Sequence, residues 1–542
     1  MPASPAPAAP TGPQKISTRS AGIVALAVMC SRVLGLAREL ILAKLFGAGF
    51  AMDAFVAAFR VPNLLRDLFA EGALSTAFVT TFSKTIKNEG DQSAWALANK
   101  VATLAVVVLS LITLLGAFFA PQLIGVLAGG FSPEKRELTV HLTRIMFPFI
   151  LLVSLAALAM GLLNARDVFG VPAMASSFFN LGSILGGVGL AWWIDPHFGP
   201  KSLTGLALGT LLGGALQLVV QFPALRKVGY RFRPDLVWRD PGVRSVLRLM
   251  GPAVIAASAV QVNVMVNGRF ASELAGDGPV SWLGYAFRLM QLPLGMFGVA
   301  IGTLTLPLIS RSAAAGNMEE FRSTLSRGMR LAFLLTIPSS VGLIALARPI
   351  ISLLYEHGKF SAESTVQTAA ALQLYALGLA AYSGIKVLAP AFYALDKRNT
   401  PMLVSFAAIG VNLGLNWLFT FRLGMQHRGL ALSTGCVAMA NFLALYVLMR
   451  RHTRFLETWL MLRTLAKLAV AAVPLALVCW GSEMTLLAGW AHLPFVLKLT
   501  YLLGTIAVAA ASFFGVAMAL GIDGLEEVSA LFRRKLGRLL KR

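Results

Sequence analysis

The sequence predicts an all-α polytopic membrane protein of about 14 transmembrane helices, arranged as two pseudo-symmetric six-helix lobes plus two C-terminal helices. Composition, recurring apolar runs and an internal repeat lead to this fold class. Of the 542 residues, 57% are hydrophobic and only 13% are charged, whereas a soluble domain carries roughly 25% charged residues. Apolar runs near the roughly 20 residues that cross a bilayer recur along the chain. The shorter alternating segments of a membrane β-barrel are not visible.

The apolar runs define the expected helices in chain order. Polar or Gly- and Pro-containing breaks separate them, and several are longer than a perpendicular helix needs, which predicts tilted spans. The expected spans are 21–47, 51–83, 99–127, 138–164, 170–194, 202–223, 249–274, 281–311, 328–355, 364–395, 401–421, 429–449, 464–488 and 495–520.

Basic residues predict the orientation of these spans. Lys and Arg concentrate in the N-terminal tail, in every second loop and in the C-terminal tail, and the intervening loops contain few. Cytoplasmic loops are enriched in Lys and Arg, so both termini are expected in the cytoplasm of a bacterial inner-membrane protein. This distribution explains most of the net charge of +23 without a nucleic-acid partner. The basic segments 225–249 and 528–542 are either amphipathic helices on anionic lipid headgroups or ordinary positive loops.

An internal repeat, with an offset of about 228 residues, relates the two halves of the chain. LNARDVFGVPAMASSFFNLG (163–182) recurs as YALDKRNTPMLVSFAAIGVNLG (393–414), which pairs Asp167 with Asp396 and Pro172 with Pro401. Six spans per half give both lobes the same orientation, the layout of an alternating-access transporter. The predicted parts are a disordered cytoplasmic tail (1–20), an N-terminal lobe (21–224), a cytoplasmic amphipathic linker (225–248), a C-terminal lobe (249–450), spans 13–14 (451–521) and a basic cytoplasmic tail (522–542).

The residue types give no support for an enzyme. Cys30, Cys436 and Cys479 lie in apolar runs without paired spacing, which favours buried small side chains over disulfides or metal ligands. The chain has no nucleotide-binding or zinc-protease motif. We therefore expect no catalytic residue, no metal site and no cofactor, apart from an unidentified monovalent ion that would couple transport. The glycine stripe Gly205, Gly209 and Gly213 predicts close helix packing.

Charged side chains in the first two spans are the most informative feature. The stretch CSRVLGLARELILAKLFGAGFAMDAFVAAFRVPNLLRDLFAEGALS (30–75) contains four arginines among acidic residues. A charge at the bilayer centre costs at least roughly 2.5 kcal/mol, so these side chains are expected to face protein or a wet cavity. One alternative is a set of structural ion pairs. On a helix with about 100° per residue, Arg60, Asn63, Asp67 and Glu71 share one face, whereas adjacent residues such as Arg38 and Glu39 point apart.

The other alternative is a cationic cavity for an anionic substrate. Arginine suits planar, bidentate binding of phosphate or carboxylate. Arg288 in span 8 brings a cation from the other lobe, and Arg269 in span 7 and Lys386 in span 10 are expected to add to it.

The same residues carry a resemblance to a known family. SRVLGLARELILAKLFGAG followed by MDAFVAAFRVPNLLRDLFAEGALSTAFV closely resembles the N-terminal signature of the MurJ/MviN family of lipid II flippases. This family belongs to the multidrug/oligosaccharidyl-lipid/polysaccharide exporter superfamily. The similarity continues at GPAVIAASAVQVN (251–263), VSWLGYAFRLMQLPLGMFGVAIGTLTLPLIS (280–310), LLYEHGKF (353–360) and KVLAPAFYALDKRNTP (386–401).

The resemblance implies fourteen spans, a lipid-tail groove at spans 13–14, and transport of lipid II from the cytoplasmic to the periplasmic leaflet. It implies that substrate-binding arginines are Arg32, Arg38, Arg66 and Arg288. Asp53, Asn63 and Glu71 match polar positions of the same region. Asp67, Phe287 and Gln291 depart from the family pattern, in which a second Arg or an acid can stand, so carboxylate coupling beside Arg288 is not implied.

Three readings of function follow. The leading one is a lipid II flippase whose arginines hold the diphosphate, reset by the membrane potential or by an ion. The second is a flippase for another undecaprenyl-linked glycan, or a drug/cation antiporter of the same superfamily. The third is a non-transporting scaffold that recruits cell-wall synthesis proteins through its basic loops.

Overall fold

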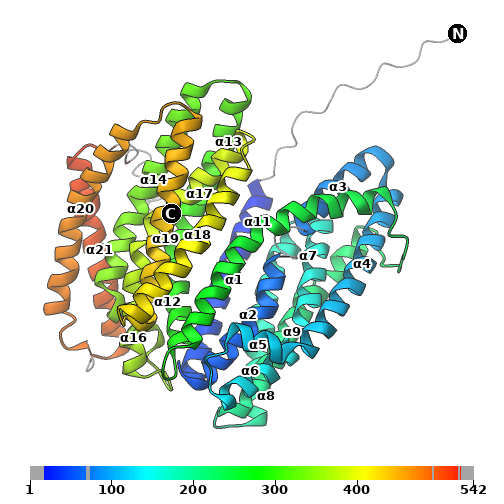
Figure 1. Cartoon of the computed structure of the whole chain (residues 1–542), viewed down its shortest axis with the longest axis horizontal. Coiled ribbons are helices and arrows are strands. Elements are labelled where there is room, and N and C mark those ends of the chain that lie inside the picture. Colours follow the sequence, from blue (N-terminus) through cyan, green and yellow to red (C-terminus); the bar gives the residue numbers. More distant parts are fainter. Residues whose placement is uncertain (1–17, 69–73, 491–492, 523–524, 526–542) are drawn as a thin grey trace. The chain divides into compact units, whose positions relative to one another are not determined.

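The computed structural model describes residues 18–68, 74–490, 493–522 and 525. Every regular element among them is a helix (Figure 1), which confirms the predicted all-α class. Most of the predicted N-terminal tail and of the basic C-terminal tail lies outside the described residues. Helix α1 begins at Thr18, so residues 18–20 of the predicted tail are helical.

The chain forms two compact units. Unit 1 comprises the chain up to Ile41, Val61–Phe118 and Thr143–Val254; unit 2 comprises Leu42–Arg60, Phe119–Leu142 and the chain from Ile255. Unit 2 therefore contains two short segments from the first half of the chain. The lobe boundaries expected from the sequence stay a prediction.

The helices of the first half carry the charges that the sequence analysis singled out. Their bounds are α1 Thr18–Phe46, α2 Phe50–Arg66, α3 Ser75–Glu89, α4 Asp91–Phe118, α5 Ala120–Leu127, α6 Pro133–Met146, α7 Phe149–Ala165, α8 Gly170–Ile194, η2 Pro200–Ser202, α9 Leu203–Val219 and α10 Phe222–Lys227.

The second half begins with the long helix α11, whose first turns belong to unit 1. The bounds are α11 Pro241–Ser272, α12 Pro279–Pro293, η3 Leu294–Val299, α13 Ala300–Ala314, α14 Met318–Ala345, α15 Ala347–Tyr355, α16 Ala362–Leu377, α17 Leu379–Ala394, α18 Asn399–Trp417, η4 Leu418–Arg422, α19 Gln426–His452, α20 Thr458–Met484 and α21 Phe495–Ala519. The segments η3 and η4 are π-helical.

Eleven of the expected spans coincide with helices long and apolar enough to cross a membrane. Ten pass individually among the described residues, and α16 with α17, bent by 43°, makes the eleventh. The three others, over 21–47, 51–83 and 249–274, correspond to α1, to α2 with α3, and to α11. The count of fourteen therefore stays a prediction, whereas a multi-pass membrane protein is established.

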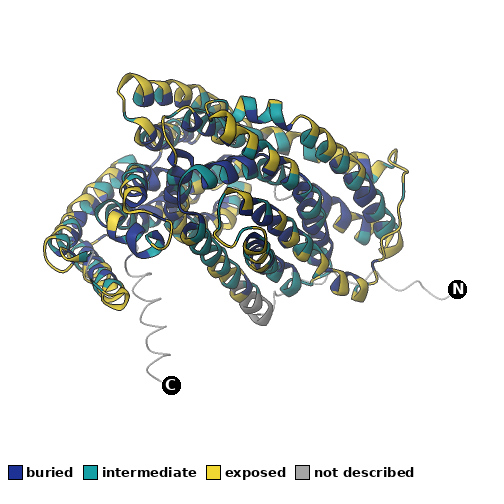
Figure 2. Cartoon of the chain, turned by 90° about the horizontal axis from the view of Figure 1, so that it is seen from below, coloured by how far each residue is buried: buried dark blue, intermediate teal, exposed yellow. Residues whose placement is uncertain are grey.

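Exposed apolar side chains agree with a lipid environment. Exposed residues run along many helices, not only along loops (Figure 2). They include Leu114 at 69%, Phe118 at 72% and Trp193 at 77% exposure. Large apolar side chains exposed in such numbers are unusual in a soluble protein but expected where lipid is the solvent.

The repeat is visible as the same local backbone in both halves. Asp167 and Asp396 both adopt a left-handed conformation, with φ of 59° and 56°. At both turns the chain closes a helix with the same hydrogen bond, from Val168 N–H to Leu163 O at 2.9 Å and from Lys397 N–H to Phe392 O at 2.8 Å. This 6→1 bond is the Schellman ending of a helix, in which Asp is tolerated at the left-handed position.

Two repeat-related asparagines tie helices together in each half. In unit 1, Asn180 of α8 donates to the carbonyl oxygen of Ser31 on α1 at 3.1 Å. In unit 2, Asn412 of α18 donates to the side chains of Asn263 and Asn267 on α11. Each asparagine thus reaches the first long helix of its own half, which extends the repeat from local backbone to tertiary contacts.

Glycines bring α8 and α9 into backbone contact. A Cβ at Gly209 would lie 2.1 Å from the Cα of Gly187, and one at Gly205 would lie 2.3 Å from the backbone nitrogen of Ala191. The stripe predicted from Gly205, Gly209 and Gly213 is therefore a packing seam, as small residues provide between membrane helices.

The final helix pair belongs to the core of unit 2. Leu468 and Cys479 of α20 and Phe513 of α21 lie in one buried cluster with Phe333 of α14. Lys467 donates to the carbonyl oxygens of Leu520 at 2.6 Å and Gly521 at 3.1 Å. A lysine at this place satisfies carbonyl groups that the end of α21 leaves open.

Residues 230–240, here called the strap, cross α4 in an irregular conformation. Helix α10 ends at Lys227 and α11 begins at Pro241, so the amphipathic helix expected as one reading of 225–249 is wrong for this stretch. Backbone N–H groups of the strap donate to side chains of α4, from Arg233 to Asn99 at 3.1 Å and from Asp235 to Thr103 at 3.0 Å. Because Asn99 and Thr103 are one turn apart, the strap follows one face of α4.

The end of the strap is held by an ion pair. Lys100 Nζ lies 2.7 Å from Asp240 Oδ2, and Gly242 N–H donates to Asp240 Oδ1 at 2.8 Å. Partial burial acts to raise the pKa of Asp240. The hydrogen bonds from Lys100 and Gly242, together with the charge of Lys100, outweigh it, so the pKa of Asp240 lies below its ordinary value.

Replacing Gly209 by Ala is expected to separate α8 from α9, because the new Cβ meets backbone that cannot rotate away. Overpacking of this kind costs roughly 1–3 kcal/mol, which should lower the midpoint of thermal unfolding of the purified protein. Gly189→Ala is the matched control, since a Cβ at Gly189 meets nothing within 4 Å. Equal melting of the two variants would contradict the packing seam.

The Asp240 ion pair predicts a definite pH dependence. The folded pKa is lowered, so the carboxylate stabilises the strap at neutral pH and loses this effect only as pH falls below about 4. The stability advantage of the wild type over Asp240→Asn should therefore stay constant from neutral pH down to about 4.5 and shrink below it. Unfolding midpoints across that range test this; an advantage that already fades between pH 7 and 5 would count against it.

Candidate functional site

A buried carboxylate at the start of α2 caps another helix in unit 2. Asp53 is 1% exposed, and its Oδ1 accepts hydrogen bonds from the backbone N–H of Ser281 at 2.8 Å and from its hydroxyl at 2.5 Å. Oδ2 accepts from the N–H of Gly278 at 2.7 Å. Gly278 is the N-cap of α12 and has no side chain to cap with. Asp53 therefore supplies, from a distant helix, the acceptor that an N-terminus requires.

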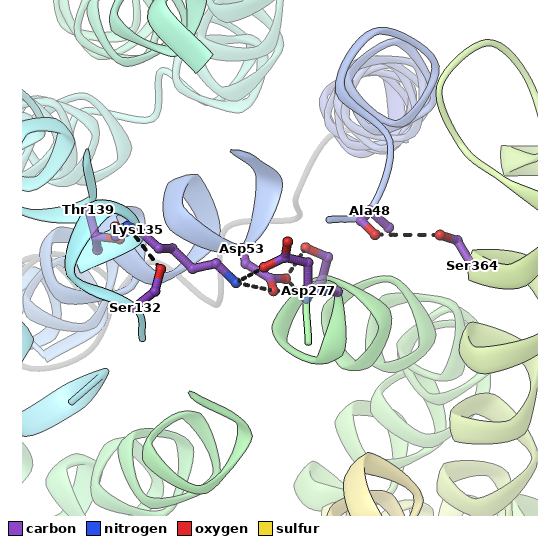
Figure 3. A network of polar contacts seen from close by, with 9 residues as sticks. Ala48, Asp53, Ser132, Lys135, Thr139, Asp277 and Ser364 are labelled. Carbon is purple, nitrogen blue, oxygen red and sulfur yellow. Dashed lines mark hydrogen bonds and ion pairs between the residues drawn. The ribbon is translucent and has the colours of Figure 1, made fainter. Parts of the chain in front are cut away.

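Lys135 of α6 completes this cluster (Figure 3). Its Nζ lies 3.4 Å from Asp53 Oδ2 and 2.6 Å from Asp277 Oδ1. Lys135 is itself 4% exposed and also lies over the rings of Phe50 and Phe131. Asp53, Lys135 and Asp277 are called the buried ion cluster below. It joins α2 and α6, from the first half of the chain, to α12 of the second.

Main-chain contacts make a second attachment within unit 2. Lys359 N–H donates to the carbonyl oxygen of Lys44 at 2.9 Å. A Cβ at Gly47 would lie 2.5 Å from Lys359 O, and one at Gly358 would lie 2.3 Å from Lys44 O. Both glycines have positive φ, 69° and 63°, so both the space and the backbone conformation require glycine. Ser364 also donates to Ala48 O (Figure 3).

Arg269 supports a third attachment. Its guanidinium pairs with Glu273 one turn later at 2.8 Å and donates to the carbonyl oxygen of Gly125 at 3.2 Å. It lies so close to Gly129 that a Cβ there would approach Nη1 to 1.8 Å. The structure thus gives this residue, expected to add to a cationic cavity, a role in holding the turn after α5 against the end of α11.

Arg60 lines a cavity inside unit 2 of about 260 Å³. Its guanidinium lies against Gly268, where a Cβ would be 1.9 Å from Nη1, and it interacts electrostatically with Tyr375. Asn267, Tyr382 and Asn441 also line the cavity. Arg60 therefore faces polar side chains of the second half of the chain.

Two predicted substrate residues lie near each other in unit 1. Arg38 is close enough to Arg66 for their positive charges to repel, and it lies 5.2 Å from the centre of the Phe179 ring. Arg66 donates to Asp67 Oδ1 at 2.8 and 3.2 Å. A π-helical turn follows Arg66, so the spacing of 100° per residue that put Asp67 beside Arg60 does not extend to Asp67. Arg38 and Glu39, expected to point apart, approach to 3.9 Å, too long for a hydrogen bond.

The other predicted residues are more dispersed. Arg32 of α1 and Arg288 of α12 are exposed, and Arg288 interacts electrostatically with Tyr355. Lys386 is exposed on α17, and Asn63 is half-buried on α2. Glu71 lies outside the described residues.

Sequence reasoning missed the residues that bind Asp53. Lys135 reads as an ordinary loop charge in FSPEKREL, and Asp277 as part of a polar turn. The only usable signal was Asp53 itself, an acid at the start of an apolar helix that requires a partner.

The fold and the buried charges define a class of protein, a polytopic helical transporter. A solved structure titled "Lipid II flippase MurJ, inward closed conformation" matches with a TM-score of 0.72 at 24% identity, covering 92% of this chain and 99% of that one. An inward-facing multidrug resistance MATE family transporter of the MOP superfamily matches with a TM-score of 0.68 at 15% identity, over 80% of this chain and 98% of that one.

Sequence comparisons identify the family. The family model described as lipid II flippase MurJ matches residues 42–501. The lipid II flippase MurJ of Burkholderia cenocepacia is 36% identical over 514 residues, 94% of this chain and 97% of that protein. A probable lipid II flippase MurJ of Vibrio cholerae is 34% identical, over 93% of this chain and 96% of that protein. The chain belongs to the lipid II flippase MurJ family.

Lys135→Met is expected to destabilise unit 2, because it leaves the Asp53 carboxylate buried without its cation. Removing one partner of a buried pair costs roughly 3 kcal/mol or more, which should lower the unfolding midpoint. Lys84→Met, at an exposed lysine of α3, is the control. Adding Asp53→Asn should recover part of the loss, since the amide oxygen still accepts from α12 without a charge. A Lys135→Met protein as stable as the control would refute the cluster's role.

Proposed function

We propose that this protein moves lipid II across the cytoplasmic membrane. Support comes from membership of a family whose relatives carry this name over nearly their whole length and from the partly buried arginines of α1 and α2. The moved headgroup is a diphosphate-linked sugar, so a carrier must hold two adjacent anionic groups while they pass the hydrocarbon region. The protein performs no covalent chemistry in this proposal.

The observation that carries the proposal is the proximity of Arg38 and Arg66. Two like charges held together within a membrane protein repel each other, and this arrangement is unfavourable unless an anion binds between or beside them. Asp67 neutralises part of the charge at Arg66, and Phe179 covers one face of Arg38. Guanidinium groups bind phosphate oxygens in a bidentate manner. Arg32 and Arg288 are proposed to complete the diphosphate site from α1 and α12.

Alternating access would require part of unit 2 to open. The buried ion cluster and the glycine contact at Gly47 hold Leu42–Arg60 and Phe119–Leu142, both from the first half of the chain, against helices of the second half. In the proposed cycle these attachments break and re-form as the repeat-related halves rock. The membrane potential supplies about 2.3 kcal/mol per charge per 100 mV, enough over a few arginines to bias such a step.

Arg38→Ala and Arg288→Ala are each expected to lower lipid II translocation strongly. Loss of a hydrogen bond between charged groups costs roughly 1.5–3 kcal/mol, which corresponds to a decrease of about tenfold or more in transport at subsaturating substrate. The measurement is lipid II exposure at the outer leaflet of cells depleted of their own flippase, with protein level checked in the membrane. Arg451→Ala, at an exposed residue after the apolar part of α19, is the control.

Conservative variants separate the role of charge from that of geometry. Arg38→Lys keeps the charge but loses the planar pair of donors, so it should recover only part of the activity. Normal translocation by both Ala variants at normal protein levels would exclude the diphosphate site and favour a scaffold. Loss of transport for a different undecaprenyl-linked glycan, with lipid II unaffected, would reassign the substrate.

A further inference from the structure

An apolar groove lies beside the strap in unit 1, away from the residues used above. It has a volume of about 220 Å³ between α4 and the first turns of α11. Its walls contain only Leu, Val, Ala and Met, among them Leu74, Val101, Leu104, Val108, Val246 and Met250. A groove without any polar group has no means of binding a soluble anion or sugar.

The groove opens on the outer face of α4. Val108 lines it and is 42% exposed, and the next turns of the same helical face carry Leu111 at 55% and Leu115 at 48% exposure. Helix α4 is one of the membrane-span candidates. The groove is therefore continuous with a surface that faces hydrocarbon.

Basic residues border the groove at its α11 end. Arg244 and Arg248 are exposed and one turn apart, so they lie on one side of α11, next to the groove residues Val246 and Met250. Arg239, at the end of the strap, is exposed as well. Three guanidinium groups at the edge of an apolar groove match the two parts of a lipid, a hydrocarbon chain and an anionic headgroup.

The strap adds the composition of a membrane interface. Phe232, Leu236 and Trp238 are 51%, 67% and 37% exposed, although Asn99, Lys100 and Thr103 hold the strap on α4. Aromatic side chains beside Arg are typical of segments at headgroup level. Because the strap is already held on α4, binding there requires little further ordering.

We propose that the groove and the strap form a binding site for an anionic phospholipid of the surrounding leaflet. One acyl chain occupies the groove between α4 and α11. The phosphate lies among Arg239, Arg244 and Arg248, which donate to its oxygens. Because the strap is the direct connection between the two repeat-related halves, the bound lipid becomes part of that connection.

The experiment is native mass spectrometry of the full chain in a mild detergent. Dioleoyl phosphatidylglycerol and dioleoyl phosphatidylcholine are titrated separately, and the fraction of protein that retains one lipid is measured. The wild type should retain the anionic lipid preferentially. Arg244→Gln with Arg248→Gln should lower this affinity roughly tenfold. Leu104→Trp, which fills the groove, should lower it while leaving the arginines in place.

A charge-matched control keeps the result specific. Arg450→Gln with Arg451→Gln removes the same charge from exposed residues of unit 2 and should leave retention unchanged. Equal retention of the two lipids by the wild type, or equal losses in the two double variants, would overturn the proposal. So would undecaprenyl phosphate that displaces phosphatidylglycerol and is the sole lipid lost in Leu104→Trp, since the groove would then hold the substrate's chain.

Discussion

Within a membrane, a carboxylate cannot be left without donors, and the arrangement around Asp53 follows from that constraint. Its two oxygens receive backbone N–H groups, a hydroxyl and an ammonium group from three separate parts of the chain. Each donor would otherwise be an unsatisfied group of its own, because Gly278 has no side chain to cap α12 and Lys135 is nearly inaccessible. One acid thus satisfies a helix end and a buried cation together. Unit 2 includes segments from both halves of the chain, and this cluster joins them.

The same constraint shapes the other polar residues of the bundle. Asn180 and Asn412 stand at repeat-related places, and each donates to the first long helix of its half. Arg269 is absorbed by Glu273 and a carbonyl oxygen. Arg38 and Arg66 differ, since they bring two positive charges near each other with one weak and one close acidic neighbour. In a structure that otherwise pairs its buried charges, this positive excess distinguishes a binding site from a brace.

Much of this architecture was predictable from the sequence, for physical reasons that particular residues illustrate. Composition gave the all-helical class, and the match of Asp167 with Asp396 anticipated two turns with the same backbone. The stripe at Gly209 anticipated backbone contact, because small residues four apart have few other uses in a membrane helix. The partner of Asp53 was not predictable, since Lys135 is remote in sequence and only the tertiary fold selects it. Helical spacing failed at Asp67 because the helix changes pitch there, and the strap is irregular because side chains of α4, not local propensity, determine its path.

The contact of Gly47 with Lys359 and of Gly358 with Lys44 is made by main chain on both sides. Its strength therefore does not depend on the charge, length or polarity of either lysine side chain. Over evolutionary time those two side chains are free to change without loosening the joint, whereas gain of a single methyl group at either glycine would force it open. A joint of this kind is specified by what the sequence omits, and it can be loosened by adding atoms but not strengthened by exchanging them.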